Sequence, residues 1–424
     1  MRRFSERLER SDPALVVYAI VASFATYFCM YAFRKPFAAA SYEGQLGELE
    51  LKTVYVIAQV LGYTASKYIG IRWVSSIASE RRGRALLAMI GAAQLALLAF
   101  ALAPPGLKAV ALFFNGLPLG MVWGLVVRYL EGRRTSELLL AGLSCSFIVA
   151  SGVVKDIGRA LLDAGVSESW MPFTVGLIFV LPFGLSVWLL ERVPPPSPED
   201  VAARVERRAM TPAERRAFFS RYAPGLLGLF AVYFLLTAYR DFRDNYGVEI
   251  FATLGYAEEP AIFTATEVPV AFGVLVALGL LYRIRDNRRA LGVTYAIMIA
   301  GALTLVIGTW LHDAEAISGA TWMVLTGIGS YLIYVPYGSI LFDRLVAVTG
   351  VAGTAVFAIY VADALGYTGS VGVQLYKDIA QSDVSRAAFF RSFTLAQAAI
   401  GVVLLSASGA YFMNKEQGTR NREV

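Results

Sequence analysis

Twelve apolar runs, most of them long enough to cross a lipid bilayer, constrain the fold of this chain more than any other feature. A membrane-spanning helix needs about 20 mainly apolar residues, and helices are expected because lipid offers no hydrogen-bond partner to backbone N–H and C=O groups. Charged residues make up 17% of the chain, against about 25% in a soluble domain. The sequence therefore predicts an all-α membrane protein. The expected spans are residues 13–38, 51–71, 84–103, 107–130, 136–160, 170–191, 222–247, 260–283, 289–311, 319–342, 353–377 and 387–413.

The loops between the runs alternate in charge. Loops that a count of twelve spans places on one side of the membrane are rich in arginine, whereas the opposite loops carry mainly glutamate and aspartate. Because basic loops remain in the cytoplasm, we expect a multi-pass protein of the cell inner (plasma) membrane with both termini cytoplasmic. This placement also accounts for the net charge of +6, so no nucleic-acid partner is predicted. The arginine-rich side holds Arg81, Arg82, Arg133, Arg134, Arg285 and Arg288, and the acidic side holds Glu48, Glu50, Asp163, Glu168, Glu258 and Glu259.

Three short patterns occur twice, in the same order in the two halves of the chain. A Tyr-Phe-x3-Ala-(Phe/Tyr)-Arg signature ends at Arg34 and again at Arg240, 206 residues later. The repeats predict two parallel six-helix bundles, an arrangement that resembles the major facilitator superfamily. The other two repeats are Lys155-Asp156-Ile157 with Lys377-Asp378-Ile379, and residues 130–133 with residues 341–344. The expected domains are an N-terminal bundle at residues 1–192, a cytoplasmic linker at 193–221 and a C-terminal bundle at 222–424.

Two longer motifs lie in the first and second runs. They read Tyr31-Ala32-Phe33-Arg34-Lys35-Pro36-Phe37 and Tyr63-Thr64-Ala65-Ser66-Lys67-Tyr68. These segments resemble the Tyr-x-x-Arg-Lys-x-Phe and Tyr-x-x-Ser-Lys-Phe motifs of the organophosphate:phosphate antiporters, which include the glycerol-3-phosphate and hexose-6-phosphate transporters. Gly353-Thr354-Ala355 and Gly366-Tyr367 are similar to that family's start of span 11.

The resemblance implies roles for three cations. Arg34 and Arg240 would hold the phosphate of the substrate, and Lys67 would assist them. The chain also departs from the family pattern, because the family's histidine in span 5 falls near Phe147 and the Asn after its Arg-Lys is replaced by Pro36.

The chemistry of arginine independently favours an anion site. An arginine at the centre of a membrane helix costs roughly 2.5–3.5 kcal/mol, so a duplicated one needs a reason. The guanidinium group offers a planar fork that suits phosphate or carboxylate, whereas lysine is a point charge. As alternatives, Arg34 and Lys67 could snorkel to the membrane surface, Arg240 could pair with Asp244, and the tyrosines could simply pack. The expected substrate-binding residues are Arg34, Arg240, Lys67, Lys35, Tyr31, Tyr63 and Tyr239.

Charged residues elsewhere in the runs suggest groups that couple transport to proton uptake and groups that form a gate. Glu267 and Asp363 lie near the middle of their runs, where a carboxylate either pairs or takes up a proton. They are expected to be proton-coupling groups or members of structural ion pairs. Toward the outer ends of two runs, a lysine-aspartate pair predicts a gate or interface salt bridge, with solvated charge as the alternative. These pairs are Lys155 with Asp156 and Lys377 with Asp378.

Together these features favour a secondary active transporter of an organic anion, a phosphorylated metabolite, by alternating access in exchange for inorganic phosphate. A proton-coupled carboxylate symporter and a non-transporting membrane sensor of sugar phosphate are the alternatives. The sequence holds no Gly-Lys-Ser/Thr phosphate loop, catalytic set or metal motif, and Cys29 and Cys145 have no zinc spacing. We therefore expect neither an enzyme nor a bound cofactor or metal. The expected partners are the lipid bilayer and a small anion, and the chain is expected to be a monomer.

Overall fold

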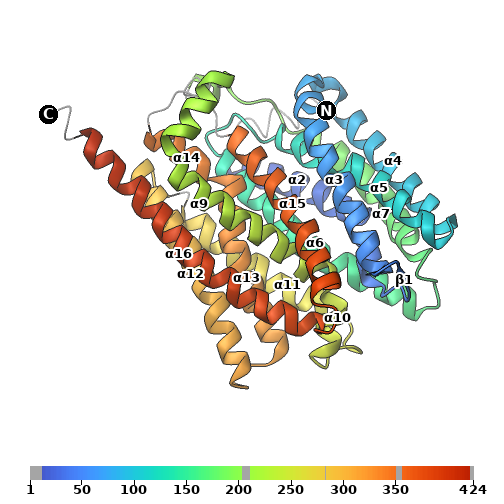
Figure 1. Cartoon of the computed structure of the whole chain (residues 1–424). Coiled ribbons are helices and arrows are strands. Elements are labelled where there is room, and N and C mark those ends of the chain that lie inside the picture. The colour runs from blue at the N-terminus through green and yellow to red at the C-terminus, as the bar shows by residue number, and fades with distance from the viewer. Residues whose placement is uncertain (1–11, 203–210, 282, 350–355, 421–424) are drawn as a thin grey trace. The chain divides into compact units, whose positions relative to one another are not determined.

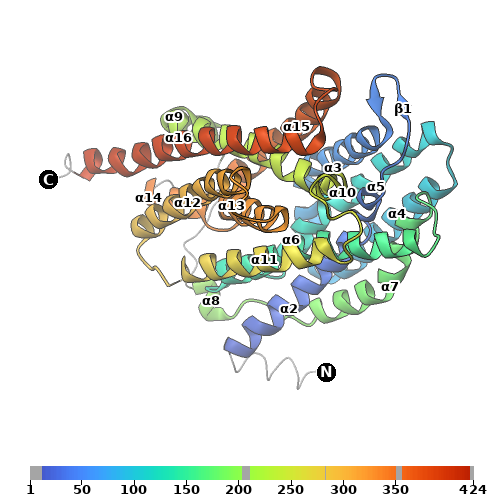
Figure 2. The ribbon, with the colours of Figure 1, turned by 90° about the horizontal axis from the view of Figure 1, so that it is seen from below.

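The computed structural model describes residues 12–202, 211–281, 283–349 and 356–420. Three parts of the chain used in the predictions lie outside these residues. They are the two termini, part of the predicted linker and the Gly353-Thr354-Ala355 motif. Nearly all of the described chain is helical, with one short antiparallel hairpin before α3 (Figure 1, Figure 2). The elements are α2 (Asp12–Tyr31), η1 (Pro36–Ala39), β1 (Gln45–Leu46), β2 (Leu49–Glu50), α3 (Leu51–Ser76), η2 (Ser79–Arg81), α4 (Arg82–Leu102), α5 (Pro105–Val127), α6 (Ser136–Asp163), α7 (Met171–Leu190), α8 (Pro198–Ala202), α9 (Pro212–Asn245), α10 (Gly247–Thr253), α11 (Ile262–Leu281), α12 (Asn287–Asp313), α13 (Gly319–Ser339), α14 (Leu341–Thr349), α15 (Val356–Ala380) and α16 (Arg386–Arg420).

Each of the twelve predicted spans coincides with a long helix in the described chain when α13 and α14 are counted as one bent span. The break between α13 and α14 bends the chain by 52°. Among the described residues, nine helices are long and apolar enough to cross a membrane, and the bent pair makes ten. The other two predicted spans correspond to α3 and α15, which carry several of the charged residues considered below. The predicted all-α membrane fold is confirmed.

The first predicted span ends earlier than expected. Helix α2 ends at Tyr31, and the chain continues through turns to η1. Pro36 contributes to the break, because proline lacks the backbone N–H that would continue the helical hydrogen bonds beyond Lys35. Arg34 therefore follows a membrane helix and does not lie within one.

Helix α9 begins earlier than the predicted seventh span, inside the segment predicted as linker. Thr211 and Glu214 form a reciprocal cap at its start: the Thr211 N–H donates to Glu214 Oε2 at 2.7 Å, and the Glu214 N–H donates to Thr211 Oγ1 at 3.3 Å. This is a capping box, and Pro212 occupies the first helical position, where its missing N–H costs nothing. Local capping chemistry thus extends α9 beyond its apolar run.

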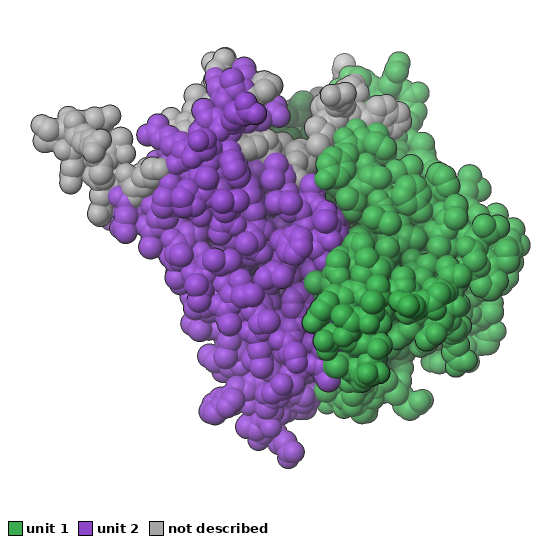
Figure 3. Space-filling view, in the orientation of Figure 1, with its two compact units in different colours: residues 1–203, 243–268, 371–386 green, residues 204–242, 269–370, 387–424 purple. Residues whose placement is uncertain are grey.

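Contacts divide the chain into two compact units, coloured separately in Figure 3. Boundaries between the units fall inside α9, α11 and α15 and after the first residue of α16. The C-terminal ends of α9 and α15, the first turns of α11 and Arg386 therefore belong with unit 1. The predicted bundle boundaries at residues 192 and 222 follow the sequence halves and remain a prediction. Unit 1 is Met1–Ala203, Arg243–Val268 and Val371–Arg386, and unit 2 is Arg204–Phe242, Pro269–Ser370 and Ala387–Val424.

Within unit 1, α3 and α5 lie side by side because glycines remove side chains from their contact. A Cβ on Gly120 would lie 2.7 Å from the backbone oxygen of Tyr63, and one on Gly116 would collide with the backbone oxygen of Gln59. Small residues allow helix backbones in a membrane to approach in this way. This contact positions the α3 residues that surround Arg34.

Candidate functional site

Two buried amide side chains hold the backbone beyond the end of α2 in unit 1. Asn115 Nδ2 donates to the Phe33 carbonyl at 3.0 Å, and Gln59 Nε2 donates to the Arg34 carbonyl at 2.8 Å. Gln59 Nε2 also donates to Asn115 Oδ1 at 2.8 Å. Buried backbone carbonyls need a hydrogen-bond partner, and the amides from α3 and α5 supply it where α2 has ended. The two amides thereby fix the position of Arg34.

The Arg34 side chain lies against aromatic rings. The residue is buried, with 4% of its surface exposed, and its Cζ lies 4.0 Å from the centroid of the Tyr63 ring and 5.7 Å from that of Tyr31. The Lys67 amino nitrogen lies 5.3 Å from the centroid of the same Tyr63 ring. The structure thus brings four of the predicted substrate-binding residues together in unit 1. Burial of Arg34 differs from the exposed position that snorkelling predicts.

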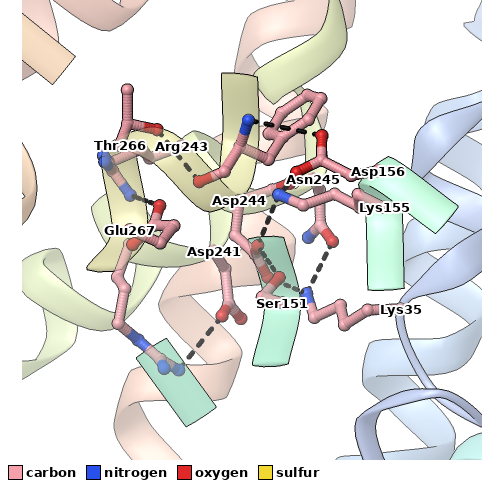
Figure 4. Close-up of polar contacts among 12 residues, drawn as sticks. Lys35, Ser151, Lys155, Asp156, Asp241, Arg243, Asp244, Asn245, Thr266 and Glu267 are labelled. Atoms are coloured by element: carbon pink, nitrogen blue, oxygen red, sulfur yellow. Dashed lines mark hydrogen bonds and ion pairs between the residues drawn. The ribbon is translucent and has the colours of Figure 1, made fainter. Parts of the chain in front are cut away.

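Lys35 belongs to a separate charged cluster of unit 1, shown in Figure 4. Its Nζ lies 2.5 Å from Asp244 Oδ2 and donates to Asn245 Oδ1 at 2.8 Å. Lys155 Nζ donates to Asp244 Oδ1 at 2.9 Å, and Ser151 Oγ donates to the same oxygen. One carboxylate therefore holds two lysines, which come from α6 and from the turn after α2. We call these five residues the Asp244 cluster.

Lys155 and Asp156 on α6 contact the ends of two other helices within unit 1. Lys155 Nζ donates to the backbone carbonyl of Asp244, near the C-terminus of α9, at 3.1 Å. Asp156 accepts from the N–H groups of Phe263 at 3.3 Å and Thr264 at 2.7 Å, in the first turn of α11. A cation at a helix C-terminus and an anion at a helix N-terminus both complement the helix dipole. Adjacent residues thus stabilise two helix ends with charges of opposite sign.

The second predicted lysine-aspartate pair also lies in unit 1 but has different partners. Asp378 Oδ1 lies 3.1 Å from Arg386 Nη2, and the Glu50 N–H donates to Asp378 Oδ2 at 3.3 Å. Arg386 also pairs with Glu50 Oε2 at 2.5 Å, and Lys377 is buried. The two copies of the repeat therefore carry ion pairs without being equivalent in their contacts.

Each predicted proton-coupling carboxylate has a hydrogen-bond partner. In unit 1, Glu267 Oε1 accepts from Arg243 Nη1 at 2.6 Å (Figure 4). Glu267 lies in the second turn of α11, nearer the helix end than the predicted central position, and the ion-pair alternative is the one observed. In unit 2, Asp363 Oδ1 accepts from the Tyr233 hydroxyl at 2.6 Å.

The second arginine of the repeated signature lies inside α9, in unit 2. Arg240 is 8% exposed, its Nη2 lies 3.2 Å from Asp241 Oδ1, and its Cζ lies 4.2 Å from the centroid of the Tyr334 ring on α13. Asp241 Oδ2 accepts from Ser370 Oγ on α15 at 2.9 Å. Asp241 is therefore the observed carboxylate partner of Arg240, whereas the alternative partner expected from the sequence, Asp244, holds lysines in unit 1.

Tyr239 lies in a packing environment. Its ring stacks on Phe390 with centroids 5.1 Å apart, and its hydroxyl accepts from Thr394 Oγ1 at 3.0 Å. Both partners belong to α16, so this predicted substrate-binding residue contributes to the contact between α9 and α16 in unit 2.

Sequence reasoning missed several residues of these sites. Gln59, Asn115 and Asp241 are polar residues within apolar runs, and that signal could have identified them. Tyr334 could not be distinguished from the other aromatic residues of its run. Among the described residues, no group of three or more His, Cys, Asp or Glu side chains is arranged to hold a metal ion.

Comparison with known proteins relates the chain to a family and to a known fold. A family model described as "Family of unknown function (DUF5690)" matches residues 36–415. No curated protein sequence matches the chain. A crystal structure of a D-xylose-proton symporter is similar with a TM-score of 0.60 and 14% sequence identity, over 94% of this chain and 96% of that chain. This likeness shows the fold of the major facilitator superfamily, which the internal repeats predict.

Proposed function

Since the chain belongs to the DUF5690 family and has the fold of the major facilitator superfamily, we propose that it is a secondary active transporter that moves a small organic anion by alternating access. The observation that carries the proposal is Arg34, a buried cation at the end of a membrane helix, held against the ring of Tyr63. Burying a charged group is costly unless partners offset the lost hydration, so a buried arginine in this position is a candidate group for binding an anion. The transporter would reside in the plasma membrane as a monomer with both termini in the cytoplasm.

Arg34 and Arg240 are the residues proposed to bind the anion. An aromatic ring contacts the face of a guanidinium group, whereas phosphate or carboxylate binds the N–H groups along its edge. The contacts with Tyr63 and Tyr334 are therefore compatible with a bound anion and would orient each guanidinium group for it. Lys67, which shares the Tyr63 ring, would add a second positive charge near Arg34.

A phosphorylated metabolite is the proposed substrate, with inorganic phosphate as its exchange partner. Support comes from the similarity of the first two runs to the organophosphate:phosphate antiporter motifs. It also comes from the grouping of the motif residues Tyr31, Arg34, Tyr63 and Lys67 within unit 1. A phosphate ester matches this chemistry because it offers several acceptor oxygens to guanidinium and ammonium donors.

The ion pairs of unit 1 are the proposed gate. The Asp244 cluster and the contacts of Asp156 tie residues 243–268 to the N-terminal part of the chain, and the contacts of Asp378 do the same for residues 371–386. Alternating access requires contacts of this kind to form in one state and break in the other. Lys35, Lys155 and Asp244 would then exchange their mutual contacts for water during transport.

A proton-coupled symporter of a carboxylate is the second candidate. Asp363 favours it, because this carboxylate on a membrane helix is hydrogen-bonded to the neutral hydroxyl of Tyr233 and could take up a proton. This candidate predicts uptake driven by a pH gradient that Asp363→Asn abolishes. A membrane sensor, in contrast, would bind sugar phosphate and exchange nothing.

The test is counterflow of radiolabelled inorganic phosphate in proteoliposomes that hold the purified full chain and are preloaded with phosphate or glycerol 3-phosphate. We expect exchange by the wild type and its loss in Arg34→Lys and Arg240→Lys, because lysine cannot present a planar fork. Arg391→Lys is the matched control, since Arg391 pairs with Asp313 at 2.6 Å in a more exposed position. Wild-type exchange rates in both Arg34→Lys and Arg240→Lys would contradict the proposal.

A further inference from the structure

A line of polar residues runs along the contact between α9 and α15 in unit 2. At one end, the Tyr233 hydroxyl donates to Asp363, and at the other, Ser370 Oγ donates to Asp241 Oδ2 at 2.9 Å. Between them the helices are close, because a Cβ on Gly366 would lie 2.5 Å from Thr237 Oγ1. The carboxylate of Asp241 is thus held in a tight interhelical contact beside Arg240.

The ion pair between Arg240 and Asp241 has unfavourable geometry. Consecutive residues of an α-helix point about 100° apart and do not face each other, so both side chains must bend to meet. Their Nη2–Oδ1 distance of 3.2 Å exceeds the roughly 2.7–2.9 Å of a strong charge-assisted hydrogen bond. A phosphate or carboxylate that presents two oxygens to the guanidinium edge would bind Arg240 with better geometry than Asp241 does.

We propose that Asp241 is an internal ligand of Arg240, which a substrate anion displaces, and that it thereby sets the anion affinity and selectivity of the site. This inference rests on the proposed function of Arg240 in anion binding. When an anion displaces Asp241 Oδ1 from Arg240, the Ser370 hydroxyl still donates to Asp241 Oδ2. The displaced carboxylate therefore keeps a hydrogen bond. The site is close to neutral at rest, and no buried guanidinium is left without a counter-charge.

Displacement also provides selectivity. A halide ion makes point contacts and cannot reproduce the two parallel hydrogen bonds of a bidentate oxyanion, so it competes poorly with an aspartate that is already in place. A phosphate ester or carboxylate gains those bonds in exchange for the Asp241 contact. Asp241 therefore favours oxyanions over chloride.

The experiment measures equilibrium binding of radiolabelled inorganic phosphate to the purified full chain in nanodiscs, with and without added chloride. In Asp241→Asn, the amide oxygen still accepts from Ser370, but the competing negative charge is gone. We expect phosphate affinity to rise on the order of tenfold and chloride to become an effective competitor. Asp313→Asn is the matched control, because it removes an equal charge from an arginine-bound aspartate elsewhere in unit 2, and it should bind phosphate as the wild type does.

Each other result has a defined meaning. If phosphate binds Asp241→Asn no more tightly than the wild type while Arg240→Lys loses binding, the displacement idea is wrong and the anion-binding role of Arg240 stands. If Arg240→Lys binds and exchanges phosphate normally, or if no variant binds phosphate, the proposed function of Arg240 fails and this inference fails with it. Should Asp241→Asn not fold, as judged by size-exclusion chromatography, Asp241→Ala carries the same expectation.

Discussion

The two copies of the arginine signature have the same sequence pattern but different backbone settings. Arg34 follows the end of α2, where Pro36 interrupts the helix, whereas Arg240 lies inside α9, which continues to Asn245. The residue that corresponds to Pro36 in the second copy is Phe242, which leaves the helical hydrogen bonds intact. The shared pattern therefore predicts a buried arginine with an aromatic neighbour. It does not predict whether that arginine lies inside a helix or after the end of one.

The copies differ most in the charge of the residue after the arginine. Lys35 turns away into the Asp244 cluster, whereas Asp241, its counterpart, pairs with Arg240 itself. A duplicated binding motif can thus become asymmetric through one flanking residue. In this chain the first copy is linked to the proposed gate, and the second carries its own competing carboxylate.

The largest expected effect is the loss of stability in Asp244→Asn. This substitution tests whether Lys35, the residue after Arg34, is held by a stronger ion pair than Asp241, the residue after Arg240. Removing one partner of a buried ion pair costs about 3–5 kcal/mol, and Asp244 holds two lysines at 2.5 and 2.9 Å. We expect a clear loss in the free energy of unfolding, measured by detergent titration in mixed micelles. Asp241→Asn should lose less, because its ion pair is single and longer at 3.2 Å.

Asp313→Asn provides the baseline for both variants. Its partner Arg391 is 44% exposed in the side chain, and exposed ion pairs contribute about 0–1 kcal/mol. If Asp244→Asn destabilised the protein no more than Asp313→Asn, the Asp244 cluster would have no structural importance and the contrast between the two copies would disappear.

An intermediate effect is expected from Gln59→Met, which tests the backbone difference between the copies. The substitution leaves the Arg34 carbonyl without the donor that Gln59 supplies at 2.8 Å. Leaving a buried acceptor unsatisfied costs about 1–3 kcal/mol, so the thermal unfolding temperature should fall. Arg240 lies within a continuous helix, so its backbone carbonyl does not require a side-chain donor of this kind.

Gln397 on α16 offers a matched control for this substitution. It is fully buried, and its amide nitrogen and oxygen have no hydrogen-bond partner among the described residues. Gln397→Met should therefore be neutral or stabilising, since it replaces an unsatisfied polar group with an apolar one of similar size. Similar destabilisation by Gln59→Met and Gln397→Met would show that the amide at residue 59 does not support the break after α2.

The smallest effects are expected from Tyr63→Leu and Tyr334→Leu, which test the feature that the two copies share. A cation–π contact is worth about 0.5–2 kcal/mol, so each substitution should weaken phosphate binding by a few-fold to about thirtyfold. Tyr68→Leu, at an exposed position of α3, should leave binding unchanged. A loss in Tyr63→Leu but not in Tyr334→Leu would mean that only the first arginine binds the anion.

The helices were predictable because apolar run length is a local property of the sequence. The runs located α4, α5 and α12 closely, and errors arose where other local chemistry intervened. Pro36 ends α2 before its apolar run ends, and the capping box at Thr211 starts α9 before its run begins. Both features, the proline and the capping box, are visible in the sequence and indicate where these two helices end and begin.

The partners of the charged residues could not be predicted in the same way. Helical spacing suggests Asp244 as a partner for Arg240, but the partner that a side chain meets depends on how the helices pack and rotate. The sequence predicts gate or interface salt bridges for Lys155 and Asp156; Lys155 pairs with Asp244, whereas Asp156 accepts from backbone N–H groups of α11. Sequence identifies which charges lie in or beside apolar runs, whereas only the tertiary structure identifies what they bind.

The adjacency of Lys155 and Asp156 has a consequence for the evolution of this chain. Because one dipeptide of α6 serves the ends of both α9 and α11, inserting or deleting a single residue before it would rotate both side chains by about 100° and lose both attachments together. Individual substitutions along the rest of α6 carry no such double penalty. Relatives of this protein should therefore tolerate substitutions at most positions of α6 better than insertions or deletions before Lys155.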